Sequence, residues 1–173
     1  VTDDQNQPIS AVNTLLEDRE GNLWCGTNKG LDRLERSGGS LRLHAIDLGM
    51  PGEYAAQSQI LSLVENTNGS LWVAAPSGLY RRSHDGSTAR YTKNDGLPTD
   101  YIQTLFIDDQ KRLWAGTRDS GFFEFSTDRV NSKVTITRSY NTRTGLPTDW
   151  IYELFETSDR KFWAATNEGL IEF

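Results

Sequence analysis

Apolar and polar residues follow one pattern four times along this 173-residue chain. In each copy a mainly apolar segment leads into a polar turn, an apolar residue followed by Trp, and a loop that ends in Gly. The copies read VNTLLEDREGNLWCGTNKGLDRL, ILSLVENTNGSLWVAAPSGLYRR, IQTLFIDDQKRLWAGTRDSGFFEF and IYELFETSDRKFWAATNEGLIEF. A pattern that returns after about 40 to 50 residues is typical of repeat architectures.

The spacing inside the pattern is fixed. The first apolar residue precedes the Trp by 12 residues in all four copies. The Gly follows the Trp by six residues in three copies and by seven in the third, where one residue is added around Asp119-Ser120. We therefore interpret one set of residues as structural, with each Trp between neighbouring units and small residues allowing close approach: Trp24, Trp72, Trp114, Trp163, Gly26, Gly116, Gly30, Gly78, Gly121 and Gly169.

Each copy predicts short strands. The segment Ile102–Ile107 is apolar on both faces, which favours an inner strand covered on each side. The Trp segment forms a second strand after the polar turn, and the residues after the Gly form a third. A weaker fourth strand is predicted at residues 89–92 and 135–140. No segment shows the sustained 3.6-residue periodicity of an amphipathic helix.

Repeats of this length with four antiparallel strands have the size of β-propeller blades. We predict an all-β chain that forms a single partial β-propeller domain over residues 1–173, with repeats at approximately 9–50, 51–98, 99–147 and 148–173. The N-terminus aligns with the segment before the third copy, which makes Val1-Thr2 the end of a fourth strand. We therefore expect the chain to belong to a larger ring or to pair with another copy.

Composition adds few constraints to this picture. The formal net charge is −6 and the basic residues are scattered, which argues against nucleic acid as a partner. No stretch approaches the 18 or more apolar residues of a membrane span. The single cysteine, Cys25, excludes an intrachain disulfide and lies beside Trp24, so we expect it to be a small buried apolar residue.

Residues with catalytic or metal-binding chemistry are few. His44 and His84 fall in the variable segments that we expect between third and fourth strands, where a solvated loop role is favoured. The pairs Glu17-Asp18 and Asp108-Asp109 offer carboxylates to calcium, but they fall at hairpin ends, where acidic residues serve turns. We predict no catalytic residue, no metal site and no cofactor.

Two turns outside the repeat pattern carry the candidate ligand-binding residues. Tyr101 follows Asp100 and Trp150 follows Asp149, in each case just before an inner strand. If that strand lines the central channel, these turns form the rim of one axial mouth. An aromatic ring beside a carboxylate can stack on a sugar and accept its hydrogen bonds. The alternative is that Tyr101 and Trp150 pack against the neighbouring blade.

The phrase I-x-x-L-x-E-D-x-x-G-N-L-W-x-G-T-x-x-G-L resembles the two-component regulator propeller repeat, which copy one matches almost letter for letter. Copies two to four depart mildly from it, with Ala74-Ala75, Phe122 and Ala165 as the main changes. The resemblance implies an extracytoplasmic (periplasmic) sensor segment of a bacterial membrane signalling protein, often a hybrid histidine kinase tied to polysaccharide use. It also implies that this segment has no kinase chemistry and no membrane contact of its own.

Three functions are compatible with these features. The first is a non-catalytic, ligand-sensing propeller segment that responds to carbohydrate, with an oligosaccharide as ligand and the remaining blades or a second copy as partner. The second is a protein-interaction scaffold. The third is part of an enzyme built on a propeller, such as a polysaccharide lyase or a quinoprotein dehydrogenase.

Overall fold

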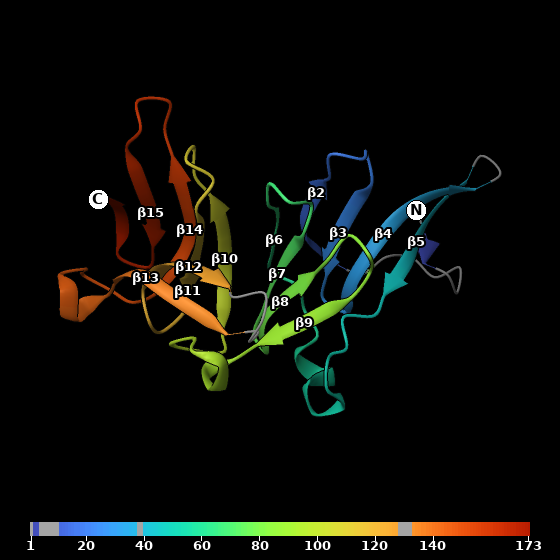
Figure 1. The fold of residues 1–173 in the computed structure, drawn as a ribbon, viewed down its shortest axis with the longest axis horizontal. Coiled ribbons are helices and arrows are strands. Elements are labelled where there is room, and N and C mark those ends of the chain that lie inside the picture. Colours follow the sequence, from blue (N-terminus) through green and yellow to red (C-terminus); the bar gives the residue numbers. More distant parts are fainter. Residues whose placement is uncertain (1, 4–10, 38–39, 128–132) are drawn as a thin grey trace.

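The computed structural model describes residues 2–3, 11–37, 40–127 and 133–173, and these residues form four β-sheets. Figure 1 shows the sheets side by side in chain order, with the first sheet and the last sheet at opposite ends. The described part of the chain is therefore an open array and does not close on itself. This confirms the prediction of an all-β partial propeller, and we call the four sheets blades 1 to 4.

The strands of each blade are consecutive in the chain, and in blades 2 to 4 they also lie in chain order across the sheet. In blade 1 the strand β1 lies out of this order, next to β5. Blade 1 contains β2 (Val12–Glu17), β3 (Leu23–Thr27), β4 (Gly30–Ser37), β5 (Ser40–Ile46) and the two-residue β1 (Thr2–Asp3). Blade 2 contains β6 (Ser62–Glu65), β7 (Leu71–Ala75), β8 (Gly78–Arg82) and β9 (Thr88–Tyr91). Blade 3 contains β10 (Ile102–Ile107), β11 (Leu113–Thr117), β12 (Phe122–Thr127) and β13 (Val134–Tyr140). Blade 4 contains β14 (Ile151–Glu156), β15 (Phe162–Thr166) and β16 (Gly169–Glu172).

The connections between blades contain short 3-10 helices at Gly52–Gln57, Lys93–Asp95 and Thr142–Thr144. Within each blade from β2 onward, consecutive strands pair antiparallel, so β2, β6, β10 and β14 each lie at one edge of their sheet. In blade 1 the strand β1 lies beyond β5 at the opposite edge. The first strands β2, β6, β10 and β14 contact one another from blade to blade, which places them on the inner side of the array. The hairpin turns between first and second strands therefore recur at one end of every blade.

Two sequence predictions about blade 1 are wrong. Val1-Thr2 was expected to end a fourth strand, but Thr2 and Asp3 pair in parallel with Arg42 and Leu43 of β5, while Val1 lies outside the described residues. His44 was expected in a segment before the fourth strand, but it lies within β5. The β4–β5 hairpin of blade 1 is longer than its counterparts, which brings His44 into the sheet. His84 lies in the turn between β8 and β9, as predicted.

Apolar clusters fill the three junctions between blades, and the repeat tryptophans lie in them. Trp24, Trp72 and Trp114 are buried in the clusters that join blades 1–2, 2–3 and 3–4, respectively. All three side chains thus pack between neighbouring blades. Trp163 is half-buried, because no described blade follows blade 4. Cys25 is buried as predicted, and burial raises the pKa of its thiol, with the nearby Asp32 carboxylate acting in the same direction.

The inner strands differ in how far they are covered. β10 lies between two neighbouring blades and buries Ile102, Thr104 and Leu105, in line with the sequence prediction. β2 and β14 lie at the ends of the array, and each leaves large apolar side chains exposed. The expectation of cover on both faces therefore holds only where a blade has two neighbours.

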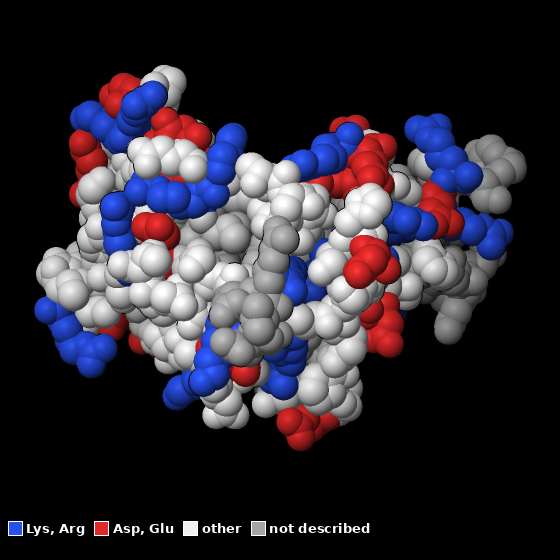
Figure 2. Space-filling view, viewed as in Figure 1, with Lys and Arg blue, Asp and Glu red and all other residues white. Residues whose placement is uncertain are grey.

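The surface in Figure 2 shows Lys and Arg side chains interspersed with Asp and Glu. This mixture agrees with the scattered basic residues of the sequence. Among the described residues, no helix has the length and apolar character needed to cross a membrane.

Candidate functional site

The two candidate turns lie just before the first strands of blades 3 and 4. Their carboxylates, Asp100 and Asp149, accept hydrogen bonds from other groups of the protein. Asp100 Oδ1 accepts a hydrogen bond from the backbone N–H of Lys93 at 2.7 Å. Asp149 accepts one from the backbone N–H of Thr142 at 2.7 Å and one from the Thr142 hydroxyl at 3.0 Å. Both carboxylates thus hold the 3-10 helices that precede them, which is a structural use of both groups.

Both aromatic residues of these turns lie close to one arginine. The guanidinium carbon of Arg118 is 5.5 Å from the Tyr101 ring centre and 4.6 Å from the Trp150 ring centre. These are distances at which a cation interacts favourably with an aromatic face. Arg118 comes from the loop in which copy three has its additional residue. The structure brings Tyr101 and Trp150 together through Arg118, and a binding role for them stays a prediction.

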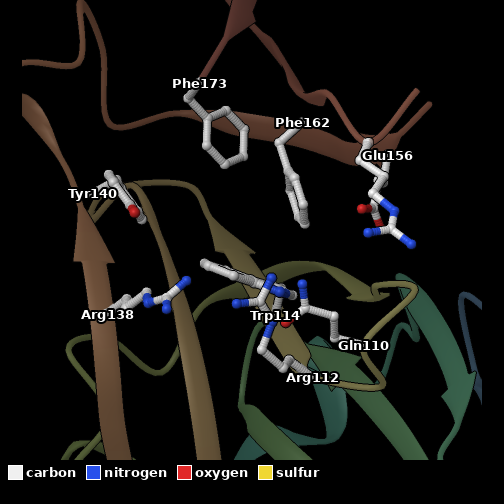
Figure 3. A pocket seen from close by; sticks show the side chains of 9 residues that line it. Gln110, Arg112, Trp114, Arg138, Tyr140, Glu156, Phe162 and Phe173 are labelled. Carbon is white, nitrogen blue, oxygen red and sulfur yellow. The ribbon is translucent and has the colours of Figure 1, made fainter. Parts of the chain in front are cut away.

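A more developed concavity lies between blades 3 and 4. It has a volume of about 450 Å³ and is lined by Gln110, Arg112, Trp114, Arg138, Tyr140, Glu156, Arg160, Phe162 and Phe173. We call it the aromatic–arginine pocket. Figure 3 shows the rings of Tyr140, Phe162 and Phe173 around one side, with the side chains of Arg112 and Arg138 near Trp114. The pocket therefore offers both ring faces and cationic groups to the same space.

The aromatic wall is continuous from blade 3 to blade 4. The Trp114 and Phe162 ring centres are 5.6 Å apart, and those of Phe162 and Phe173 are 5.4 Å apart. The Tyr140 and Phe173 ring centres are 5.8 Å apart. Such separations are typical of favourable aromatic pairs. A ring that enters the pocket would meet aromatic groups from both blades.

Three arginines give the pocket its charge, and each is held by a protein carboxylate through its Nε atom. The distances are 2.5 Å from Arg112 to Asp108, 3.4 Å from Arg138 to Glu124 and 3.1 Å from Arg160 to Asp109. Within the described part of the chain, their Nη groups donate no hydrogen bond to a protein acceptor. These N–H groups can therefore donate hydrogen bonds to a carboxylate or hydroxyl oxygen of a ligand.

Asp108 supports this pocket from inside the protein. Its side chain is fully buried, and it accepts hydrogen bonds from the Trp114 indole at 2.9 Å and from the Arg112 backbone at 2.8 Å. Burial alone would raise the pKa of Asp108, but these bonds and the Arg112 guanidinium outweigh it and hold the pKa below its ordinary value. Asp108 thus fixes Arg112 and Trp114 as an anion. Its bonds are those of a structural turn, so they give no support to a calcium role.

The sequence did not point to this pocket. Its arginines and Gln110 occupy positions where the four copies differ, and those positions showed no motif. Trp114 was assigned to structure, yet one of its sides also lines the pocket. The only available signal was the number of Arg residues in the hairpin turns and outer strands of copies three and four. Among the described residues, no three His, Cys, Asp or Glu side chains gather as a metal site.

Comparison with protein families finds matches for two of the four copies. The model of the Two component regulator propeller family matches residues 6–29 and 96–119. These segments contain Trp24 and Trp114, whose structural positions were described above. The chain therefore carries two-component regulator propeller repeats, as its sequence pattern indicates. The comparison with curated proteins finds no match.

Solved structures with the same fold include sensor domains and enzymes. The extracellular domain of the hybrid two component system BT3049 from B. thetaiotaomicron is 22% identical, with a TM-score of 0.74 over 94% of this chain and 21% of that one. The corresponding domain of BT4673 from the same organism is 19% identical, with a TM-score of 0.74 over 95% and 24%. Virginiamycin B lyase from Staphylococcus aureus is 16% identical, with a TM-score of 0.61 over 94% and 55%.

These neighbours establish the propeller fold. The chain spans between a fifth and a quarter of the two B. thetaiotaomicron domains. Because one fold carries both sensing and lyase activity among these proteins, function has to be argued from the residues of this chain.

Proposed function

We propose that this chain is a ligand-sensing propeller segment of a two-component-type signalling protein, and that it binds its ligand without catalysing a reaction. The observation that carries this proposal is the match of residues 6–29 and 96–119 to the Two component regulator propeller family. The likeness to extracellular domains of two component systems supports an extracytoplasmic position for this segment.

The aromatic–arginine pocket is the proposed binding site. Its aromatic wall suits the apolar face of a ring, and the Nη groups of Arg112 and Arg138 suit an oxygen anion. A saccharide that carries a carboxylate combines both features. We therefore propose an acidic oligosaccharide as the ligand, which makes the carbohydrate response of the sequence prediction more specific.

Sensing follows from the position of the pocket between two blades. Gln110, Trp114 and Arg138 come from blade 3, whereas Glu156, Phe162 and Phe173 come from blade 4 or its end. A ligand that contacts both blades stabilises one relative arrangement of the two, and it shifts the population toward that arrangement. In the full protein this shift would pass to the output module.

Titration calorimetry with a galacturonate trisaccharide and with the neutral trisaccharide maltotriose tests the proposed site. The acidic trisaccharide should bind and maltotriose should bind at least tenfold more weakly. Arg138→Gln should weaken acidic binding by a factor of about ten or more, because it removes a charged hydrogen bond. Arg42→Gln, an exposed position in the outer strand β5, is the matched control. If Trp150→Ala weakens binding and Arg138→Gln does not, the site lies at the axial rim instead.

A further inference from the structure

The place of the aromatic–arginine pocket in its junction recurs as a concavity at the other two junctions between blades. One of about 290 Å³ lies between blades 2 and 3, and one of about 180 Å³ lies between blades 1 and 2. Each of the three contains the repeat Trp of the preceding blade and the residue four positions before it, namely Gln110, Asn68 and Glu20. Each also contains the residue before the Trp of the following blade, namely Phe162, Leu113 and Leu71. The repeat therefore builds one kind of groove three times, with different side chains around it.

The groove between blades 2 and 3, which we call the cationic groove, is lined by the basic side chains of Arg81, Lys111 and Arg112. Arg81 is half-buried, and its guanidinium carbon lies 5.9 Å from the Trp72 ring centre and 6.0 Å from that of Tyr91. Its Nε atom is buried, and among the described residues its guanidinium has neither a hydrogen-bond acceptor nor a carboxylate partner. A charge that is partly removed from water without a counter-ion favours an anion beside it.

Arg112 connects the cationic groove to the aromatic–arginine pocket, because its side chain lines both. Asp108 holds its Nε atom, while its Nη groups donate to no acceptor in the described part of the chain. Glu124 also lines the cationic groove, but its carboxylate lies 3.4 Å from Arg138 Nε, which belongs to the neighbouring pocket. Arg138 therefore offsets the charge of Glu124, and the two sites meet at the Arg112 guanidinium.

The groove between blades 1 and 2 differs in its charge. It is lined by three carboxylates and three guanidinium groups, those of Asp18, Glu20, Glu65, Arg19, Arg33 and Arg82. Arg19 Nε lies 2.8 Å from Glu65, and Arg33 lies 2.5 Å from Glu35, so these two arginines already have carboxylate partners. An acidic ligand finds no excess of positive charge there. The row of cationic sites therefore comprises the two grooves on either side of blade 3.

We propose that the cationic groove is a second subsite for the acidic oligosaccharide of the aromatic–arginine pocket. The ligand crosses the turn between β10 and β11 at Arg112, with one carboxylate near Arg138 and another near Arg81 and Lys111. Carboxylates that recur along a chain are the feature of a linear polyuronate, so the ligand is a chain of uronate units rather than a sugar with a single acidic group. This inference rests on the proposed function, because it extends the site described there.

Titration calorimetry with a galacturonate disaccharide and a galacturonate hexasaccharide tests the second subsite. The hexasaccharide should bind about twentyfold more tightly or better, because it reaches both sites at once. This gain exceeds the roughly fivefold statistical advantage of a longer chain that offers more positions to a single site. Arg138→Gln should weaken the binding of both saccharides, since both occupy the aromatic–arginine pocket.

Substitutions in the cationic groove separate the two sites. Arg81→Gln should remove most of the gain of the hexasaccharide and leave the Kd of the disaccharide within about twofold. Asn68→Asp, at an exposed position of the same groove, should act in the same direction because it adds a negative charge. Arg33→Gln is the matched control, since Arg33 lies opposite Trp24 as Arg81 lies opposite Trp72, and it should leave both affinities unchanged.

Three results would overturn the second subsite, and they differ in what they say of the pocket. A hexasaccharide gain near the statistical value, with Arg138→Gln still weakening the disaccharide, removes the second subsite and leaves the proposed function in place. Weak binding of both saccharides that Arg138→Gln does not change removes both. An equal loss for the two saccharides in Arg81→Gln shows that Arg81 shapes the pocket instead of contacting the longer chain. Each variant has to keep the circular dichroism spectrum and Tm of the unchanged chain, and the exposed Lys111→Gln replaces Arg81→Gln if the latter lowers the Tm.

Discussion

Blades 2 and 3 place Trp72 and Trp114 at the same position of the repeat, but the two indole groups are held differently. Trp114 Nε1 donates to Asp108 Oδ2 at 2.9 Å. Trp72 is only 1% exposed, and its Nε1 has no hydrogen-bond partner among the described residues. Blade 1 resembles blade 3, since Trp24 Nε1 donates to Asp18 at 2.8 Å. The repeated Trp position therefore occurs in two forms, with the indole N–H bonded to a carboxylate in blades 1 and 3 and without such a bond in blade 2.

The residue six positions before the Trp explains the difference. It is Asp in blades 1 and 3, but it is Asn66 in blade 2 and Thr157 in blade 4. Asn66 Oδ1 already accepts from the backbone N–H groups of Asn68 at 3.3 Å and Ser70 at 3.0 Å. The other end of the Asn66 side chain is an NH2 group, where aspartate has a second carboxylate oxygen. An NH2 group and the Trp72 indole N–H are both donors, so they cannot form a hydrogen bond with each other.

A second difference concerns the contact between the first and second strands. In blade 3, Thr104 faces Gly116, and in blade 2, Ser62 faces Ala74. The Thr104 methyl group occupies the space that a Cβ on residue 116 would need, whereas serine has no such methyl. Blades 2 and 3 thus fill about the same volume at this contact with different pairs of residues.

Of the substitutions that test this comparison, removal of the Asp108 side chain should have the largest effect on stability. Asp108→Ala should lower the free energy of unfolding by roughly 3 to 5 kcal/mol, because it leaves the Arg112 guanidinium and the Trp114 indole without their buried partner. Chemical denaturation measures this change. Asp109→Ala is the control, since Asp109 is exposed and its carboxylate pairs with the exposed Arg160. Equal effects of both substitutions would show that the buried bonds are unimportant.

Acid should act on blades 1 and 3 through the same carboxylates. For Asp18, burial would raise the pKa, but hydrogen bonds from Trp24, Asn22 and Glu20 outweigh it and leave the pKa lowered, as for Asp108. Since an unfolded Asp titrates near pH 3.9, the unfolded state binds more protons below about pH 5. The stabilisation is complete above that pH and is lost as the pH falls through 4 and below. Denaturation curves between pH 7 and 3 should show this loss, and Asp108→Asn should reduce it.

Packing between first and second strands gives the next largest effect. A Cβ on residue 116 would lie 2.7 Å from Thr104 Cγ2, so Gly116→Ala should destabilise the fold by about 1 to 3 kcal/mol. Thr104→Ser in the same chain recreates the pair of blade 2 and should recover part of the loss. A double-mutant cycle measures the coupling. Additive effects of the two substitutions would contradict the volume-exchange interpretation.

The missing acceptor of blade 2 can be supplied. Asn66→Asp recreates the arrangement of blades 1 and 3 and should raise the free energy of unfolding by about 1 kcal/mol, through a hydrogen bond to the Trp72 indole. The indole ¹H–¹⁵N resonance of Trp72 should shift downfield as well. Asn68→Asp, which changes the charge equally in the same turn, should leave this resonance in place. An unchanged resonance in Asn66→Asp would indicate that a water molecule already accepts a hydrogen bond from the Trp72 indole.

The sequence predicted the repeated architecture because Trp24, Trp72 and Trp114 are positioned by local spacing. It could not predict the aromatic–arginine pocket, because Arg112, Arg138 and Phe173 meet there only when blade 4 packs on blade 3. The parallel pairing of β1 with β5 was missed for the same reason, since nothing local specifies a parallel partner. Nor did the sequence indicate that Arg118 would lie close to both the Tyr101 ring and the Trp150 ring.

Substitutions in the turns between first and second strands should have the smallest effect on stability. Gly21 and Gly69 adopt φ values of 81° and 78° in blades 1 and 2, whereas Lys111 in blade 3 adopts 65°. A side chain in this left-handed region is strained, and Gly removes the strain while it increases the freedom of the unfolded chain. Lys111→Gly should therefore raise the free energy of unfolding by about 0.5 to 1 kcal/mol. Gln110→Gly, one residue earlier at a position without positive φ, should lower it, and urea denaturation of both variants distinguishes strain from a general response of the turn to glycine.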